Sequence, residues 1–65
     1  MKLNNREIEV LSYLRSQGAS NAYQAAFFLK IKMKNAENIL QSLVAKGCAT
    51  KRPDSIVYEY KGLSW

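Results

Sequence analysis

The sequence predicts an α+β domain in which three helices are followed by a two-stranded β-hairpin. Capping patterns at Asn4 and Asn21 start two helical runs, and a third run repeats apolar residues at helical spacing. Beyond Gly47 the pattern changes to β-prone runs separated by a polar turn. A chain of 65 residues is too short for two domains, so we expect one domain over residues 1–65. A domain of this size buries only about 60% of the surface that its unfolded chain exposes.

The first helix is expected to begin after Asn4 and to stop at Gly18. Asn4 can cap the helix, Glu7 stands three residues later as in a capping box, and Leu3 and Ile8 occupy the two positions of a hydrophobic staple. Gly18 fits the position just beyond a helix end. The predicted core-facing stripe is Ile8, Val10, Leu11 and Leu14, and the opposite face carries Glu9, Tyr13 and Ser16.

The second helix is expected to run from Asn21, its cap, to about Leu29. Gln24 completes a second capping box. Three alanines on the inward face allow another helix to approach closely. The predicted inward face is Ala22, Ala25, Ala26 and Leu29.

The third helix is expected over residues 33–46, after a short connection at residues 30–32 in which Ile31 is the apolar anchor. Gly47 ends it, and Lys46 in the last turn suits the helix dipole. The apolar stripe of this helix is predicted to be Ala36, Ile39, Leu40, Leu43 and Val44.

The predicted hairpin pairs residues 48–51 with residues 56–60 across the polar turn 52–55, in which Pro53 takes the second position. Cys48 opens the first strand, where an apolar side chain normally packs, so we expect it in the core. Tyr58 and Tyr60 fall on one face of the second strand. That face either closes the core or flanks a binding surface.

The composition argues against several classes of protein. The chain has no His and one Cys, so it has neither an intramolecular disulfide nor a cysteine-based zinc site, and we expect no metal and no cofactor. None of its five acidic residues stands in a recognised catalytic motif, so we do not expect an enzyme. The longest apolar run has five residues, far short of the roughly 20 that span a membrane. We therefore expect a cytoplasmic protein with no membrane partner.

The order of elements and two motifs resemble the winged helix-turn-helix family over about residues 4 to 61. The stretch from Ser20 to Ile31 is similar to the family's second helix and turn, with a small polar cap and a small residue at Ala26. The run Ile39-Leu40-x-x-Leu43-Val44-x-Lys46-Gly47, followed by Cys48 and Lys51, resembles the family's recognition helix and its exit into the wing.

This resemblance implies a DNA-binding transcription regulator of bacterial, phage or plasmid origin. Within the family, the chain looks most like the small stand-alone regulators of bacterial fimbrial operons. Gln41 stands where the Z-form nucleic-acid binders of the family have an aromatic residue, so Z-form recognition is not expected. Two features depart from the family pattern: Lys30 occupies a turn position that is often Gly, and the wing tip is short.

The charge distribution agrees with a nucleic-acid partner. The chain carries a net charge of +5, with ten Lys and Arg against five Asp and Glu. Residues 30–52 alone hold a local +5, whereas residues 1–29 give +1 and residues 53–65 give −1. Lysine and arginine contacts to phosphates supply much of the affinity for DNA. We therefore predict that double-stranded DNA binds along the turn, the third helix and the wing.

Roles within this predicted site follow from position. Lys30, Lys32 and Lys46 would contact phosphates, and Lys51 and Arg52 would place the wing on the backbone or in the minor groove. The predicted base-reading face of the third helix, opposite its apolar stripe, is Lys34, Asn38, Gln41, Ser42 and Ala45, with Asn35 at its margin.

Glu37 has two possible roles in this helix. It either accepts a hydrogen bond from cytosine N4 or pairs with Lys34 one turn earlier, and the structural pairing is the favoured prediction.

Aromatic residues of the second helix provide the alternative hypothesis of a winged-helix module for protein–protein interaction. Tyr23 and Phe27 lie away from the alanine face. They are either covered by the first helix, the wing or the tail that carries Trp65, or they form a protein interface together with Trp65. Because a single winged helix covers only a half-site, specific DNA binding implies a homodimer or a partner protein.

Overall fold

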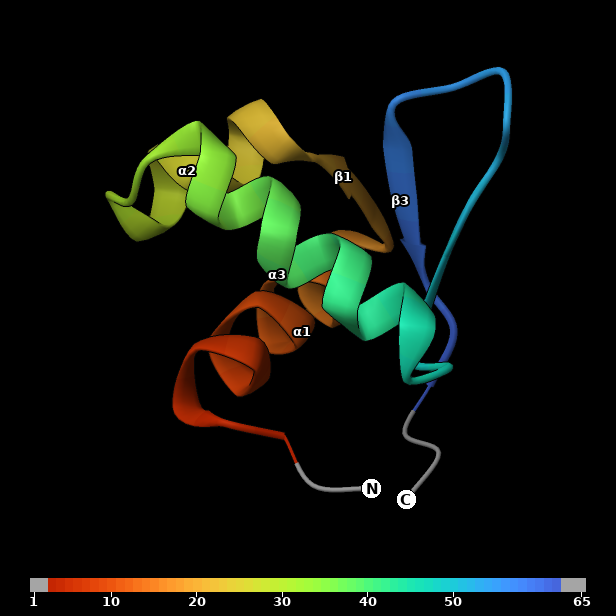
Figure 1. Cartoon of the computed structure of the whole chain (residues 1–65), viewed down its shortest axis with the longest axis horizontal. Coiled ribbons are helices and arrows are strands. Elements are labelled where there is room, and N and C mark those ends of the chain that lie inside the picture. Colours follow the sequence, from red (N-terminus) through yellow and green to blue (C-terminus); the bar gives the residue numbers. More distant parts are fainter. Residues whose placement is uncertain (1–2, 63–65) are drawn as a thin grey trace.

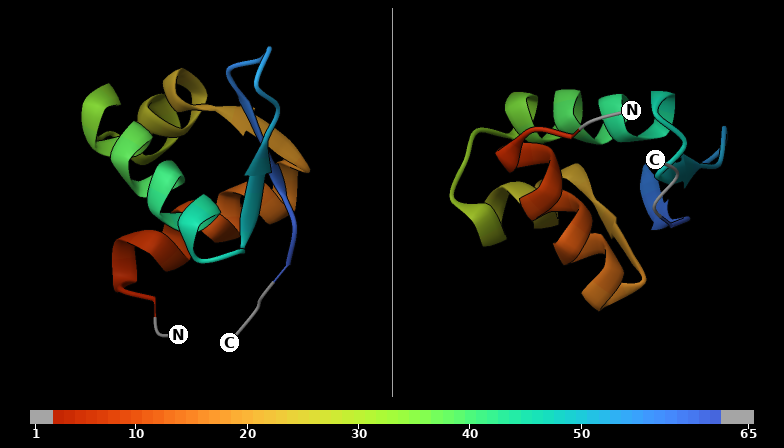
Figure 2. Two further views of the ribbon diagram at one scale, coloured as in Figure 1. Left: turned by 45° about the vertical axis from the view of Figure 1, so that its right-hand side comes forward. Right: turned by 90° about the horizontal axis from the view of Figure 1, so that it is seen from below.

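The computed structural model describes residues 3–62, which form three helices and a small antiparallel sheet (Figure 1). The α+β class is confirmed, and the arrangement is compatible with a winged-helix layout. Helix α3 lies across α1 and α2, and the strands pack beside the helices (Figure 2). In chain order the elements are α1 (Asn5–Gln17), β1 (Ala19–Asn21), α2 (Ala22–Leu29), α3 (Met33–Ala45), β2 (Ala49–Lys51) and β3 (Val57–Tyr60).

Both predicted capping boxes are confirmed. The Asn4 side chain accepts a hydrogen bond from the Glu7 backbone N–H at 2.8 Å, and the Glu7 carboxylate accepts one from the Asn4 N–H at 2.9 Å. At the start of α2, Asn21 accepts from the Gln24 N–H at 2.8 Å, and Gln24 accepts from the Asn21 N–H at 3.3 Å. These reciprocal bonds satisfy backbone donors that the first turn leaves unpaired.

The helix ends differ in the residue that reverses the chain. Gly18 ends α1 with φ 81°, and its N–H donates to the Leu14 carbonyl at 2.7 Å. Lys30 ends α2 in the left-handed conformation, with φ 56° and ψ 46°. A side chain in this conformation costs about 1–2 kcal/mol that glycine avoids. The sequence expectation that this turn position suits glycine therefore has a structural basis, although a lysine occupies it.

The sheet has three strands, so the expectation of a two-stranded hairpin is incomplete. β3 is the central strand and pairs antiparallel with both β2 and β1. The predicted hairpin of β2 and β3 is present, and we call this hairpin with its turn the wing. A hydrogen bond from the Ser55 N–H to the Arg52 carbonyl at 3.2 Å closes the turn. The added strand β1 joins α1 to α2 and places Ala19 opposite Glu59. Its pairing ties the first half of the chain to the last strand.

Most of the predicted core is confirmed, but two members of the stripes are exposed. Ile8 is 46% exposed and Val44 37% exposed. In α1 the buried face includes Glu7 in place of Ile8, and Tyr13, predicted on the opposite face, packs against the core. Cys48 is buried as expected, and Tyr58 is buried with Tyr60 packed against the core. The face of β3 that carries the two tyrosines therefore closes the core. The largest fully buried side chains are Leu14, Leu40, Leu43, Val10, Cys48 and Ser20.

Candidate nucleic-acid interface

Helix α3 is held in place by three fully buried residues on its inner side, and its outer side is open to solvent. Ala36, Leu40 and Leu43 pack into the core and leave no side-chain surface exposed. The polar residues on the outer side are Lys34, Asn35, Asn38 and Gln41, all exposed as predicted, and Ala45 is exposed beside them.

The predicted base-reading residues open into grooves on opposite flanks of α3. Asn35 and Asn38 line a groove on the side of α1, where Asn5 and Arg6 form the other wall. Gln41 lines a second groove on the side of the wing, together with Lys51. Asparagine and glutamine can both bond the N6 and N7 edge of adenine. The solvent-exposed face of α3, which we call its crest, thus carries side-chain amide groups on both sides.

Glu37 does not form the predicted pair with Lys34. It accepts a hydrogen bond from Gln41 Nε2 at 3.3 Å, one turn later in the helix, and both residues face the wing-side groove. Within residues 3–62, no ion pair involves Lys34. The amine of Lys34 therefore extends from the start of α3 toward solvent.

The remaining predicted phosphate contacts are exposed in the turn and the wing. Lys30 and Lys32 flank the turn between α2 and α3, and Lys51 and Arg52 lead into the wing turn. The Arg52 guanidinium lies 3.7 Å from the Glu59 carboxylate on the neighbouring strand, and its side chain is still 77% exposed. A pair this open contributes little to stability and leaves the guanidinium accessible.

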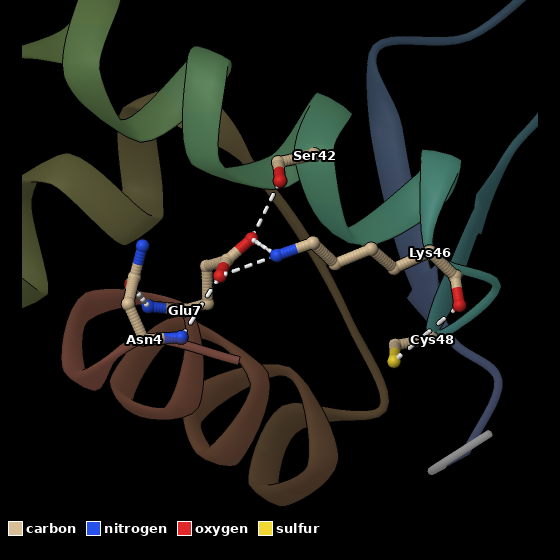
Figure 3. Close-up of polar contacts among 5 residues, drawn as sticks. All are labelled: Asn4, Glu7, Ser42, Lys46 and Cys48. Carbon is tan, nitrogen blue, oxygen red and sulfur yellow. Dashed lines mark hydrogen bonds and ion pairs between the residues drawn. The ribbon is translucent and has the colours of Figure 1, made fainter. Parts of the chain in front are cut away.

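Two predicted DNA contacts, Ser42 and Lys46, face α1 instead of the solvent (Figure 3). Ser42 Oγ donates to Glu7 Oε2 at 2.5 Å, and Lys46 Nζ lies 2.8 Å from both carboxylate oxygens of Glu7. The placement of Ser42 on the outer face of the helix is therefore wrong. The phosphate role predicted for Lys46 conflicts with its bond to a buried carboxylate, because a buried charge requires a partner.

Glu7 is the centre of this network; the sequence predicted its capping role but not its bonds to the end of α3. Its side chain is only 3% exposed, and it accepts bonds from Asn4, Ser42 and Lys46 at once. The hydrogen bonds from Lys46, from Ser42 and from the Asn4 backbone lower the pKa of Glu7 from 4.5 to about 2, although burial acts in the opposite direction. The ionised carboxylate joins α1 to the end of α3.

Apolar side chains also lie beside the candidate interface. Met33 opens α3 and Ile56 follows the wing turn at 59% exposure, and both line a hollow shared with Tyr23 and Lys51. Sequence reasoning assigned them no role. An exposed apolar residue following a turn is the signal that could have identified Ile56, because an apolar contact suits the methyl group of thymine.

The aromatic residues of α2 are exposed, as one of the two sequence hypotheses required. Tyr23 is 61% exposed, Phe27 81% and Phe28 63%. The Phe28 ring stacks on Tyr13 of α1 with a centroid distance of 4.5 Å. We call the exposed rings of Tyr23, Phe27 and Phe28, with Tyr13, the aromatic surface. Trp65, the third residue of the predicted interface, lies outside the described residues.

No family model matches the chain, and neither a curated protein nor a solved structure matches it. Among residues 3–62, no helix combines the length and apolar character needed to cross a membrane. No cluster of His, Cys, Asp and Glu in the same residues is arranged to hold a metal ion.

Proposed function

We propose that this protein binds double-stranded DNA and regulates transcription, with α3 in the major groove and the wing on the phosphate backbone. The observation that carries the proposal is the gathering of exposed cations around the polar crest of α3. The turn before the helix, its first turn and the wing supply them, and the opposite side of α3 is fixed in the core. These cations are Lys30, Lys32, Lys34, Lys51 and Arg52.

The shape of the molecule supports this use of α3. The helix crosses the front of the molecule, and the wing extends beside it without covering its crest (Figure 1). A recognition helix reads base edges mainly with its first turns. Lys34, Asn35 and Asn38 occupy those turns, and Gln41 follows one turn later. The turn lysines and the wing cations then reach phosphates on either side of the groove.

In the wing-side groove, the carboxylate of Glu37 supplies the proposed interface with a hydrogen-bond acceptor. Glu37 and Gln41 are bonded to each other, which holds the Gln41 amide against the carboxylate. Gln41 can bond adenine, and Glu37 can accept from cytosine N4. Lys51 on the other wall of this groove offsets the negative charge of Glu37 near the phosphates.

A titration with a mixed-sequence duplex tests the proposal, because Lys34→Ala and Asn38→Ala remove exposed groups without disturbing the core. Each variant should weaken binding by about 1–3 kcal/mol if it loses a base contact. Arg15→Ala is the matched control, since it removes an exposed cation from the far end of α1. Binding is measured by fluorescence anisotropy at low and near-physiological salt. Unchanged affinity in both α3 variants would refute the assignment of the interface.

The salt dependence provides an independent check. Loss of one phosphate contact should reduce the slope of log K against log salt by about 0.9. Lys32→Ala should therefore flatten the dependence, whereas Asn38→Ala should leave the slope unchanged and lower the affinity at every salt concentration. Amide chemical shifts that change mainly over residues 30–52 would support the same surface.

A second candidate function is a winged-helix module that binds another protein chain. The exposure of Tyr23 and Phe27 favours it, because paired aromatic rings on a surface are typical of protein interfaces. Under this function Phe27→Ala abolishes partner binding, and the two α3 substitutions have no effect. The two functions use adjoining faces of the molecule, which meet at Lys30 and at the hollow that Tyr23 shares with Lys51.

A further inference from the structure

We propose that the aromatic surface on α2 is the contact face for a second copy of this chain. The proposal rests on the second candidate function, because it names the partner of the same surface, and it does not depend on DNA binding. Phe27, the most exposed ring at 81%, stands at its centre between Tyr23 and Phe28.

The charge distribution favours a second copy of this chain, and not an acidic protein, as the partner of the aromatic surface. Helix α2 contains no charged residue from Ala22 to Leu29, although the whole chain carries +5. An acidic partner would be attracted to residues 30–52, where the exposed cations gather. Two identical basic chains instead repel each other over most of their surface. The aromatic surface has Lys30 at its edge as its one charged neighbour among the residues that line the hollow, so two copies meet least repulsion there.

The surface offers both a protruding ring and a hollow. The exposed ring of Phe27 forms one wall of an open hollow, whose other walls are Tyr13, Tyr23, Gln24, Phe28 and Lys30. A two-fold axis through this surface would place each Phe27 in the hollow of the other copy, as a symmetric contact requires. The stack of Phe28 on Tyr13, with rings inclined by 28°, fixes one wall of the hollow before association.

The area of the surface indicates a weak dimer. An aromatic side chain buries about 150–250 Å², so the three exposed rings supply roughly 400 Å² on each chain. Two copies would then bury roughly 800 Å², less than the about 1,200–2,000 Å² of a stable interface. We therefore expect reversible association that increases with protein concentration.

Sedimentation equilibrium of the full chain tests the proposal at about 50 and 500 mM salt, where screening differs strongly. Association should strengthen at the higher salt, because screening reduces the repulsion between two +5 chains and leaves the apolar contact intact. Phe27→Ser should weaken dimerisation at least about tenfold, as expected for an aromatic residue at the centre of an interface. Ile8→Ser is the matched control, since it removes an exposed apolar side chain from α1, and it should leave dimerisation unchanged.

Three results would overturn the proposal: a chain that stays monomeric at both salt concentrations, association that weakens with salt, or equal losses in the Phe27 and Ile8 variants. Amide spectra of Phe27→Ser establish that the variant remains folded. Titration of the same variant with a DNA duplex separates the two functions. Retained DNA binding with lost dimerisation supports the proposal, and retained dimerisation in this variant refutes it whatever the DNA result.

Discussion

Lys34 lies in the first turn of α3 and Lys46 directly follows its last residue, and the two lysines have opposite environments. Lys46 reaches across to α1 and bonds the buried carboxylate of Glu7, whereas Lys34 extends into solvent at the start of α3. The first stabilises the fold, and the second is available to a ligand. The comparison shows that the place of a basic residue along a predicted recognition helix does not decide its environment, because Lys46 bonds Glu7 of the fold and Lys34 is exposed.

The substitution with the largest expected effect on stability removes the carboxylate that bonds Lys46. Glu7→Gln preserves the shape of the side chain and removes the buried charge that pairs with the Lys46 amine. We expect a loss of about 3 kcal/mol in the free energy of unfolding, measured by urea denaturation. Glu9→Gln, at an exposed position of the same helix, should change it by less than about 0.5 kcal/mol. Equal effects of the two variants would contradict the role of Glu7.

The same network predicts acid sensitivity. The pKa of Glu7 is lowered from 4.5 to about 2 in the folded protein, so its contribution to stability is complete above about pH 5 and is lost as the pH falls toward 2. We expect this carboxyl to account for about 3 kcal/mol over that range, since a tenfold change in proton affinity corresponds to about 1.36 kcal/mol. In Glu7→Gln the dependence on pH should be shallower by the same amount. If the free energy of unfolding depends on pH equally in the two proteins, the ionisation of Glu7 is not the source of the acid sensitivity.

Replacing each lysine with methionine compares the two positions directly. Lys46→Met leaves Glu7 with only neutral donors, and we expect it to lower the free energy of unfolding by about 2 kcal/mol. Lys34→Met removes a solvated amine and should change stability by less than about 0.5 kcal/mol. Thermal and urea unfolding of both variants measure the contrast. A loss of stability in Lys34→Met as large as in Lys46→Met would show that the two lysines contribute equally to the fold, which contradicts the comparison.

The last comparison concerns Lys30. The fold holds the backbone of this residue in the left-handed conformation, whereas its amine is exposed. Lys30→Gly should raise the free energy of unfolding by about 1 kcal/mol, because glycine adopts the left-handed conformation without a Cβ clash. Lys30→Ala keeps the Cβ and removes the amine, so it should give no such gain. A gain in the alanine variant would instead point to charge repulsion around the turn.

The local features of the fold could be predicted because their signals lie within a few residues. Asn4 and Glu7 form a capping box three residues apart, and Asn21 and Gln24 repeat the pattern. Strand β1 could not be predicted, because Ala19–Asn21 has neither β-branched residues nor enough length to show alternation. It pairs because β3 presents a second edge, which is a property of the folded sheet.

The candidate site was predicted less completely than the fold. The exposure of Lys34, Asn38 and Gln41 follows from the position of the apolar stripe, which helical periodicity determines. The bond between Glu7 and Lys46 joins residues 39 positions apart, and no local pattern indicates it. Periodicity therefore predicts Ser42 on the outer face and charge predicts Lys46 as a phosphate contact, whereas both side chains bond Glu7 of α1.

The place of β3 in the chain has a consequence for synthesis. Within residues 3–62, β3 is the central strand and follows all the other elements, so β1 and β2 lack this partner until residues 57–60 have been made. A nascent chain that ends before this point has three helices and two short unpaired segments. Because contacts distant in sequence form slowly, we expect the sheet to assemble in one late step. A chain interrupted in the wing would lose the pairing of both outer strands at once.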